Sequence, residues 1–332
     1  MIGVFILNEL LWLTLGAAAV LLTEILGWLY WRYLGKGSFK SFINKNQKPE
    51  GPFKIIHKSQ TPTQKIALVD VEGEMWIYSN GEVMFSTTKE EDEYAEVIVH
   101  IPMAAAKSVK NVLIIGGGGG ITTREALRYE EVESITSVDI DDIMLHYGKN
   151  LDRLVEFNKG SLSHRKVRTV IADGRSYVEN SLETWDVIIV DLPEPTSKCP
   201  SLSRLFTLQF YNQLRDHLNP GGAISIGCST SNWMPEYMWS IETTLKEAGF
   251  FTIPFHHFSV NTGVDWGYIL ATTLPVEAGD IELKIASDFL TEERLQDILH
   301  LPYYLMNWED EGKVQTDENK VLLEIVKEAY GY

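Results

Sequence analysis

Four apolar runs in the sequence end in residues that could contact a ligand. The first run leads into five consecutive glycines, residues 116–120, and the next three end in Asp139, in Asp173–Gly174 and in Asp191. Glycine lets a ligand approach the backbone closely, while a carboxylate accepts hydrogen bonds or a proton. Open parallel sheets bind their ligands at the carboxyl ends of the strands. We therefore expect one site that several strand ends form together.

The glycine run favours a nucleoside over a dinucleotide. No frame fits the G-x-G-x-x-G pattern, whereas Gly116, Gly118 and Gly120 fit G-x-G-x-G. Asp139 follows about one strand–helix–strand unit later, where a carboxylate could accept hydrogen bonds from ribose hydroxyls. This combination predicts an S-adenosyl ligand. Taken alone, Asp139 or Asp173 could equally cap the helix that follows its strand.

The elements that must position these residues alternate along the chain. From Asn111 onward, apolar runs alternate with helical segments, which predicts an α/β fold with a doubly wound, Rossmann-like sheet of the S-adenosylmethionine methyltransferase type. The predicted strands are VLIIG, SITSVD, KVRTVIAD, WDVIIVD and AISIGCS, with FTIPFHHFSV and WGYILATT as a closing pair. Helices are expected over 121–130, 141–156, 203–217 and 233–248, and a turn at NPGG, residues 219–222.

A small β-rich subdomain is expected before this sheet. Between Phe53 and Phe85, short strand-like runs are separated by turn signals at Glu72–Gly73 and Asn80–Gly81, which predict hairpins. The predicted division is an apolar anchor helix over 1–34, a linker over 35–52, the β-rich subdomain with its following helix over 53–105, and a Rossmann-like catalytic domain over 106–332, with helices of the tail packed on its outside.

The first 34 residues favour a membrane anchor. They are apolar almost throughout, and a helix of about 20 such residues crosses a bilayer. Lysines and arginines follow this segment, which predicts that the catalytic domain faces the cytoplasm from the cytoplasmic membrane. Glu9 and Glu24 leave a second interpretation open, in which a buried or membrane-surface helix pairs the subunits of a cytoplasmic protein.

Composition limits the classes of partner. Lysine and arginine total 29 against 46 acids, a net charge of −17 that argues against nucleic acid and favours a small cationic substrate. The acidity could also serve solubility alone. The two cysteines are too few for a disulfide framework, and the histidines show no metal-ligand spacing with them. We therefore expect no metal site.

Separated motifs between residues 60 and 330 carry a family resemblance. In chain order they are EEDEYAEVIVH, VLIIGGGGGITTREAL, VDID, ADG, VDLPEP, FTLQFY and WGY. Together they resemble the motifs of the spermidine synthase family of polyamine aminopropyltransferases, and look most like bacterial members that carry membrane segments. The resemblance implies decarboxylated S-adenosylmethionine as co-substrate, a small amine as acceptor, and a homo-oligomer.

The resemblance also implies roles for individual residues. Asp191 is the catalytic acid–base residue. The donor is held by Gln64, Gly116, Gly118, Gly120, Asp139, Asp173 and Gly174, and the acceptor by Tyr94, Glu96, His100, Glu194 and Trp266. The chemistry supports Asp191 independently, because a protonated amine must lose a proton before it can attack the carbon beside a sulfonium. Tyr94 and Trp266 could cradle an ammonium group, or be ordinary core aromatics.

The chain departs from the family's motifs at positions that bear on both the donor and the acceptor. Gly119 stands where the family's GGGDGG has an aspartate that, by the resemblance, holds the ammonium of the decarboxylated donor. Asn80 and Met84 replace the aspartate and glutamine of LDGxxQ. Three functions are therefore open: aminopropyl transfer; use of intact S-adenosylmethionine for 3-amino-3-carboxypropyl transfer, methyl transfer or donor cleavage; and membrane-tethered nucleoside binding without turnover.

Overall fold

The computed structural model describes residues 42–44, 47–49, 51–260 and 262–330. The predicted anchor over 1–34 and much of the linker over 35–52 lie outside these residues. Within the described ranges, no helix combines the length and the apolar character that a membrane crossing needs.

A four-stranded antiparallel sheet comes first in the chain. Its strands pair in sequence order: β1 (Phe53–Gln60), β2 (Lys65–Val71), β3 (Glu74–Ser79) and β4 (Glu82–Ser86). Both predicted hairpin turns are confirmed, since φ is 54° at Glu72, 96° at Gly73, 51° at Asn80 and 95° at Gly81. Two successive positive φ angles suit the twist of a two-residue hairpin turn. One face of the sheet packs against the helices beside the larger sheet, and Ile66 and Ile77 share a buried core with Ile121 and Met144 there.

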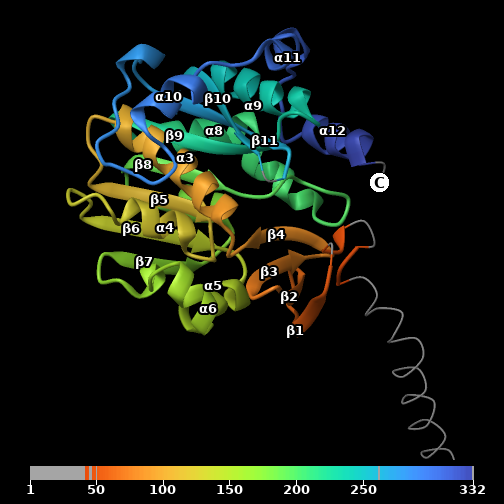
Figure 1. The fold of residues 1–332 in the computed structure, drawn as a ribbon. Helices are drawn as coiled ribbons and strands as arrows, with labels where there is room; N and C mark the ends of the chain where they lie inside the picture. The colour runs from red at the N-terminus through yellow and green to blue at the C-terminus, as the bar shows by residue number, and fades with distance from the viewer. Residues whose placement is uncertain (1–41, 45–46, 50, 261, 331–332) are drawn as a thin grey trace, which may run out of the picture.

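The second sheet has seven strands in the order β10-β11-β9-β8-β5-β6-β7 (Figure 1). They are β5 (Asn111–Gly116), β6 (Ser134–Asp139), β7 (Val167–Ile171), β8 (Trp185–Asp191), β9 (Leu218–Thr230), β10 (Phe251–Ser259) and β11 (Val264–Thr272). The first five are parallel, and β10 and β11 form the predicted closing antiparallel pair. The predicted α/β fold is thus confirmed, with a mixed sheet. Strand order reverses between β5 and β8, the position where open α/β sheets bind ligands.

Helices cover both faces of this sheet (Figure 1). They are α3 (Lys89–Ala105), α4 (Ile121–Ala126), α5 (Asp142–Asn150), α6 (Asp152–Phe157), α7 (Gly174–Glu179), α8 (Leu208–Asp216), α9 (Pro235–Glu247), α10 (Glu292–Ile298), α11 (Tyr303–Met306) and α12 (Val321–Tyr330). Alternate residues of β5 serve two cores. Leu113 and Ile115 pack in the core that includes α8 and α9, while Val112 and Ile114 pack in the core that includes α3. This double burial explains the unbroken apolar runs of the central strands.

Several helix predictions need correction. The helix expected over 121–130 ends at Ala126, and the one over 141–156 breaks at Leu151, where ψ is 109°. The segment 203–217 is divided between a 3₁₀ helix, Pro200–Phe206, and α8. Helix α7 was not predicted.

The predicted turn at NPGG lies inside β9 instead of before it. The pairing of β8 with β9 jumps from Trp185–Leu218 to Val187–Ala223, so residues 219–222 stand opposite Asp186 alone. Gly221 has φ +78°, and the Asn219 side chain donates a hydrogen bond to Asp186 Oδ1 across 2.8 Å. The turn residues are therefore absorbed as an irregularity of the strand.

Candidate active site

The ends of three parallel strands bring the glycine run between two aspartates. Gly116 at the end of β5 is the register partner of Asp191 at the end of β8. On the other side, the Gly118 N–H donates a hydrogen bond to Asp139 Oδ2 across 3.0 Å. A Cβ added at Gly116 would lie 2.0 Å from the Asp191 carbonyl oxygen, and one at Gly118 would lie 2.5 Å from Asp139 Oδ2. Side chains are therefore excluded at both positions by the neighbouring strand ends.

Asp191 is suited to exchange a proton near neutral pH. Burial raises the pKa of its carboxyl to about 6, although the hydrogen bond from Tyr94 lowers it. The Tyr94 hydroxyl donates to Asp191 Oδ1 across 3.2 Å. A carboxylate with a pKa close to the working pH can take a proton from a substrate and release it again.

Aromatic rings lie beside Asp191. The ring of Tyr94, on α3, meets the ring of Trp266, on β11, edge-on at 5.4 Å between centroids. The indole N–H of Trp266 donates to Glu90 Oε1 across 3.3 Å. Tyr268 lies at the same centroid distance from Tyr94. The structure thus brings the predicted residues Tyr94, Trp266 and Asp191 together from three separate elements, with a further carboxylate at their edge.

Asp139 is held by backbone donors. Burial raises the pKa of its carboxyl to about 6, while the N–H groups of Asp141 and Gly118 lower it. Asp141 in turn caps α5 and accepts hydrogen bonds from the Thr61 and Thr63 hydroxyls across 2.6 and 2.5 Å. These two threonines lie in the β1–β2 turn, so the turn of the small sheet is docked next to the end of β6.

Gln64 follows these threonines in the same turn. Its side-chain oxygen accepts a hydrogen bond from the Ser79 hydroxyl, which orients the amide. Because the adjoining Thr61 and Thr63 are hydrogen-bonded to Asp141, Gln64 lies near the end of β6. The family resemblance implies a role for Gln64 in binding the nucleoside.

Asp173 has the capping geometry that the sequence left open. Its Oδ1 accepts a hydrogen bond from Ser176 N across 2.9 Å at the start of α7. The Ala172 N–H donates to the Asp139 carbonyl oxygen across 3.0 Å, so Asp173 lies beside the Asp139 strand end. A Cβ at Gly174 would lie 2.5 Å from Ile115 Cγ2, which leaves no room for a side chain between α7 and β5.

Glu194 lies in the loop after Asp191 and is joined there by the last helix. The Tyr330 hydroxyl, on α12, donates to Glu194 Oε1 across 3.3 Å, and burial raises the pKa of Glu194. The sequence contained no local signal for Tyr330, because the contact depends on a chain separation of 136 residues.

Glu96 and His100 are not brought to this group of residues. Glu96 accepts hydrogen bonds from the backbone N–H groups of residues 288–290, at 3.3, 2.8 and 2.8 Å. The His100 ring contacts Glu125 Oε2 and the Tyr129 hydroxyl, both at 3.1 Å. One turn of helix separates the two residues, so they share a face of α3 that differs from the face of Tyr94. In the structure, both residues make hydrogen bonds to neighbouring segments of the protein.

A sequence model of the spermine/spermidine synthase domain matches residues 91–276, more than half of the chain. The chain belongs to the spermine/spermidine synthase family. The family resemblance found in the motifs is therefore confirmed.

Curated relatives agree with this assignment. The chain is 33% identical over 241 residues to a polyamine aminopropyltransferase of Oceanobacillus iheyensis, covering 73% of this chain and 46% of the relative. It is 32% identical over 223 residues to a polyamine aminopropyltransferase of Leptospira interrogans, covering 67% of this chain and 44% of the relative. The chain thus spans less than half the length of these two relatives.

Two solved spermidine synthases have the same fold. The enzyme of Thermotoga maritima superposes with a TM-score of 0.67 at 23% identity, over 77% of this chain and 88% of the other. A spermidine synthase in complex with the transition-state analogue AdoDATO gives 0.69 at 22% identity, over 82% of this chain and 99% of the other.

The ring of Phe85 packs against Gly119, the position at which this chain departs from the family's glycine motif. A Cβ at Gly119 would lie 2.7 Å from Phe85 Cζ and 2.9 Å from Ile121 Cδ1. A larger side chain at residue 119 would therefore require Phe85 to move.

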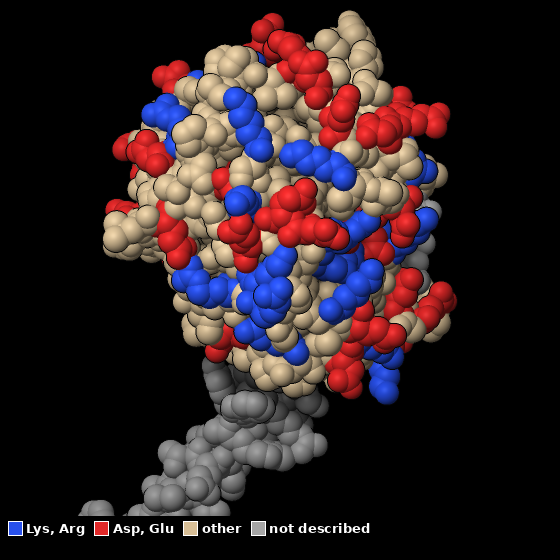
Figure 2. Space-filling view, turned by 90° about the vertical axis from the view of Figure 1, so that its left-hand side faces the viewer, with Lys and Arg blue, Asp and Glu red and all other residues tan. Residues whose placement is uncertain are grey.

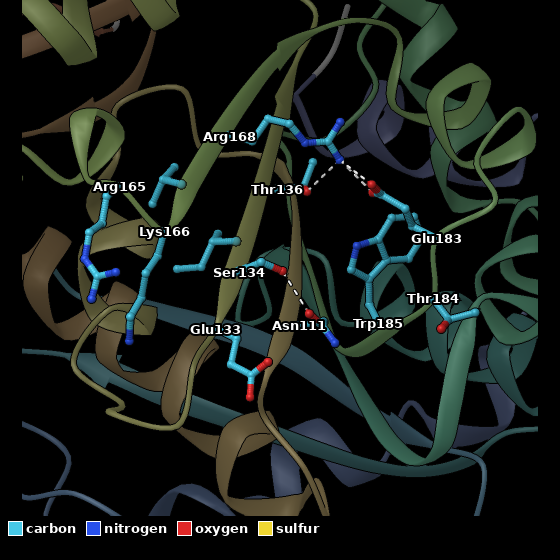
Figure 3. A pocket seen from close by; sticks show the side chains of 12 residues that line it. Asn111, Glu133, Ser134, Thr136, Arg165, Lys166, Arg168, Glu183, Thr184 and Trp185 are labelled. Atoms are coloured by element: carbon cyan, nitrogen blue, oxygen red, sulfur yellow. Dashed lines mark hydrogen bonds and ion pairs between the residues drawn. The ribbon is translucent and has the colours of Figure 1, made fainter.

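The opposite end of the sheet contains a separate hollow of about 450 Å³ (Figure 3). It is lined by the first residues of β5, β6, β7 and β8 and by charged side chains of both signs, among them Arg165, Lys166, Glu133 and Glu183. None of the predicted site residues lines it.

Figure 2 shows acidic and basic side chains intermixed over one face of the molecule. In the described ranges, no group of three or more His, Cys, Asp or Glu residues could hold a metal ion.

Proposed function

We propose that this protein is a polyamine aminopropyltransferase. It would move the aminopropyl group of decarboxylated S-adenosylmethionine to an amine such as putrescine and release methylthioadenosine. The observation that carries the proposal is the Asp191 carboxylate, which has a pKa of about 6, adjoins the glycine run and accepts a hydrogen bond from Tyr94. The names of the curated relatives support the same reaction.

The donor would bind along the edge formed by β5, β6 and β7. Gly116, Gly118 and Gly120 would let the nucleoside lie against the backbone, and Asp139 would accept hydrogen bonds from its ribose. By the family resemblance, Gln64, Asp173 and Gly174 would bind the rest of the nucleoside. Support comes from the hydrogen bond of Gly118 to Asp139 and from the position of Gln64 in the docked turn.

The acceptor amine would bind between Asp191 and the aromatic rings, with Glu194 close behind in the same loop. Asp191 would attract the ammonium form and take one proton from it. The neutral nitrogen then attacks the methylene carbon beside the sulfonium. A C–N bond forms as the C–S bond breaks, and its electron pair neutralises the sulfur, so that methylthioadenosine leaves as a thioether. Pro193 and Pro195 restrict the loop that holds these groups in line.

Product analysis with each possible donor tests the reaction. The protein is incubated with decarboxylated or intact S-adenosylmethionine, with and without putrescine or spermidine, and the products are identified by mass spectrometry. We expect methylthioadenosine and an aminopropylated amine only from the decarboxylated donor with an amine. No product from any combination, together with measurable donor binding, would reject the proposal in favour of a binding protein.

Use of intact S-adenosylmethionine is the second candidate. Gly119 provides no carboxylate that would repel the carboxylate of the intact donor, and Phe85 lies where such a group would stand. Methylthioadenosine or S-adenosylhomocysteine formed from the intact donor would favour this candidate over the first.

We also propose the division and location that the sequence suggested. Residues 1–34 would anchor the chain in the cytoplasmic membrane, residues 35–52 would link the anchor to the two folded parts, 53–105 and 106–332, and the chain would form a homo-oligomer. This rests on the sequence and the family resemblance. Fractionation of cells that express the full chain, or the chain from residue 35 onward, tests the anchor. Recovery of the full chain in the soluble fraction would contradict it.

A further inference from the structure

Glu91 is a carboxylate beside Asp191 to which the reaction described above gives no role. It precedes Tyr94 by three residues on α3, so the two side chains share one face of the helix. Tyr94 on that face donates its hydroxyl hydrogen bond to Asp191 Oδ1 across 3.2 Å. Glu91 Oε2 accepts a long hydrogen bond, 3.4 Å, from the backbone N–H of Ser86. Among the residues that the structure describes, no lysine, arginine or histidine forms an ion pair with it.

The charged groups with the largest influence on Glu91 are all negative. Burial raises the pKa of Glu91 well above its usual value, and the negative charges of Asp191, Glu90 and Asp92 raise it further. Two neighbouring carboxylates in a partly buried place repel each other unless a cation lies between them or one of them takes a proton. Their arrangement therefore suits an ammonium group, which would bind both and restore their charge.

The side chains packed against Gly119 explain why the second carboxylate near Asp191 comes from helix α3 and not from the glycine run. Phe85 Cζ and Ile121 Cδ1 fill the space in front of Gly119, so the run itself presents no charged group there. The residue after Phe85 is Ser86, whose N–H contacts Glu91. Strand β4 therefore has two effects here. The ring of Phe85 fills the space in front of Gly119, and the backbone N–H of the next residue, Ser86, orients the Glu91 carboxylate.

We propose that Glu91 and Asp191 together bind an ammonium group of a substrate. The inference rests on the proposed function, in which both the acceptor amine and the aminopropyl chain of the donor carry such a group. Glu91 is then a specificity-determining residue that selects cationic ligands at a site whose glycine run contributes no carboxylate.

Binding measurements on the Glu91→Gln variant test this inference without turnover. Isothermal titration calorimetry gives the dissociation constants of putrescine, of decarboxylated S-adenosylmethionine and of methylthioadenosine, which has no ammonium group. We expect roughly tenfold or greater weakening for one ammonium ligand, as expected for the loss of a charge-assisted hydrogen bond, and no change for methylthioadenosine. Weaker putrescine binding identifies the acceptor as the source of the ammonium group, and weaker binding of the decarboxylated donor identifies the donor.

The matched control is Glu93→Gln, which removes a negative charge from the same helix. Burial raises the pKa of Glu93, and its charged neighbours are Lys89, Glu90, Glu96 and Arg294, without Asp191. We expect wild-type affinities in this variant. Equal affinity of wild type and Glu91→Gln for both ammonium ligands would overturn the inference, as would a wild type that binds neither. A wild type that binds them through Glu91 but forms no product would reject only the proposed function.

Discussion

The Tyr94 hydroxyl donates a hydrogen bond to Asp191 Oδ1 across 3.2 Å and so joins helix α3 to the end of β8. The same tyrosine packs edge-on against Trp266 of β11. A carboxylate suited to exchange a proton and the aromatic rings beside it are therefore held in one arrangement. Burial raises the pKa of Asp191 to about 6, and this hydrogen bond, which favours the ionised carboxyl, keeps it from rising further.

Removal of this hydroxyl moves the pH profile. In Tyr94→Phe the pKa of Asp191 rises above about 6, because the hydrogen bond that lowers it is lost. The acid limb of kcat/KM then shifts to higher pH by about one unit, the size expected for a hydrogen bond to a charged group. The control is Tyr268→Phe, whose hydroxyl contacts His257 instead of Asp191. An acid limb that coincides with that of wild type in Tyr94→Phe would contradict this account.

A side chain at Gly118 weakens donor binding. The new Cβ of Gly118→Ala would lie 2.5 Å from Asp139 Oδ2 and must displace the carboxylate from its hydrogen bond with the backbone. We expect at least tenfold weaker binding of methylthioadenosine in calorimetry, which corresponds to about 1.4 kcal/mol. Gly279→Ala is the control, because a Cβ there meets no atom within 4 Å. Unchanged affinity in Gly118→Ala would place the nucleoside elsewhere.

Replacement of Glu96 reduces stability and leaves substrate binding intact. Glu96 is 4% exposed and accepts hydrogen bonds from three successive backbone N–H groups, residues 288–290. In Glu96→Ala these three donors lose their partner, among them the N–H of the buried Leu290, which lowers the free energy of unfolding by about 3 kcal/mol. Urea denaturation measures the loss, with the exposed Glu247→Ala as control. A changed KM for the amine with an unchanged free energy of unfolding would show instead that Glu96 contributes to acceptor binding.

The buried Glu125 makes stability depend on pH in the acid range. Burial alone would raise its pKa, but hydrogen bonds from His100 and Arg128 and the charge of Arg124 lower it from 4.5 to about 2. A folded-state pKa below the unfolded value stabilises the protein above about pH 4.5, by about 3 kcal/mol, and this stability is lost as the pH falls toward 2.

The Glu125→Gln variant keeps the shape of the side chain and removes this dependence. Thermal melts of both proteins between pH 7 and pH 3 should show a large difference at neutral pH that narrows on acidification. A constant difference across this range would show that the charge of Glu125 contributes nothing to stability.

The strand-end residues were the most predictable part of the site. Gly116, Asp139 and Asp191 are local signals, because each stands where an apolar run stops, and the topology of a parallel sheet brings such positions to one edge. The hairpin turns at Glu72–Gly73 and Asn80–Gly81 were predictable for a similar reason, since short-range backbone preferences decide them.

The contacts that depend on tertiary packing could not be predicted. Tyr330 of the last helix donates a hydrogen bond to Glu194, and Glu96 accepts one from the backbone N–H of Phe289. No local sequence pattern predicts either contact. The motif around Tyr94 groups residues that face in different directions, because helix α3 turns by 100° per residue. Glu91 and Tyr94 therefore lie near Asp191, whereas His100 contacts Glu125.

The central claim is that Asp191 accepts the proton of an amine that attacks decarboxylated S-adenosylmethionine. The most direct test measures the rate of methylthioadenosine formation with putrescine, in wild type and in Asp191→Asn, alongside the affinity of each for methylthioadenosine. We predict that the variant loses at least about a hundredfold in rate, as for the loss of a general base, and retains its nucleoside affinity. Equal rates in the two proteins would contradict the account.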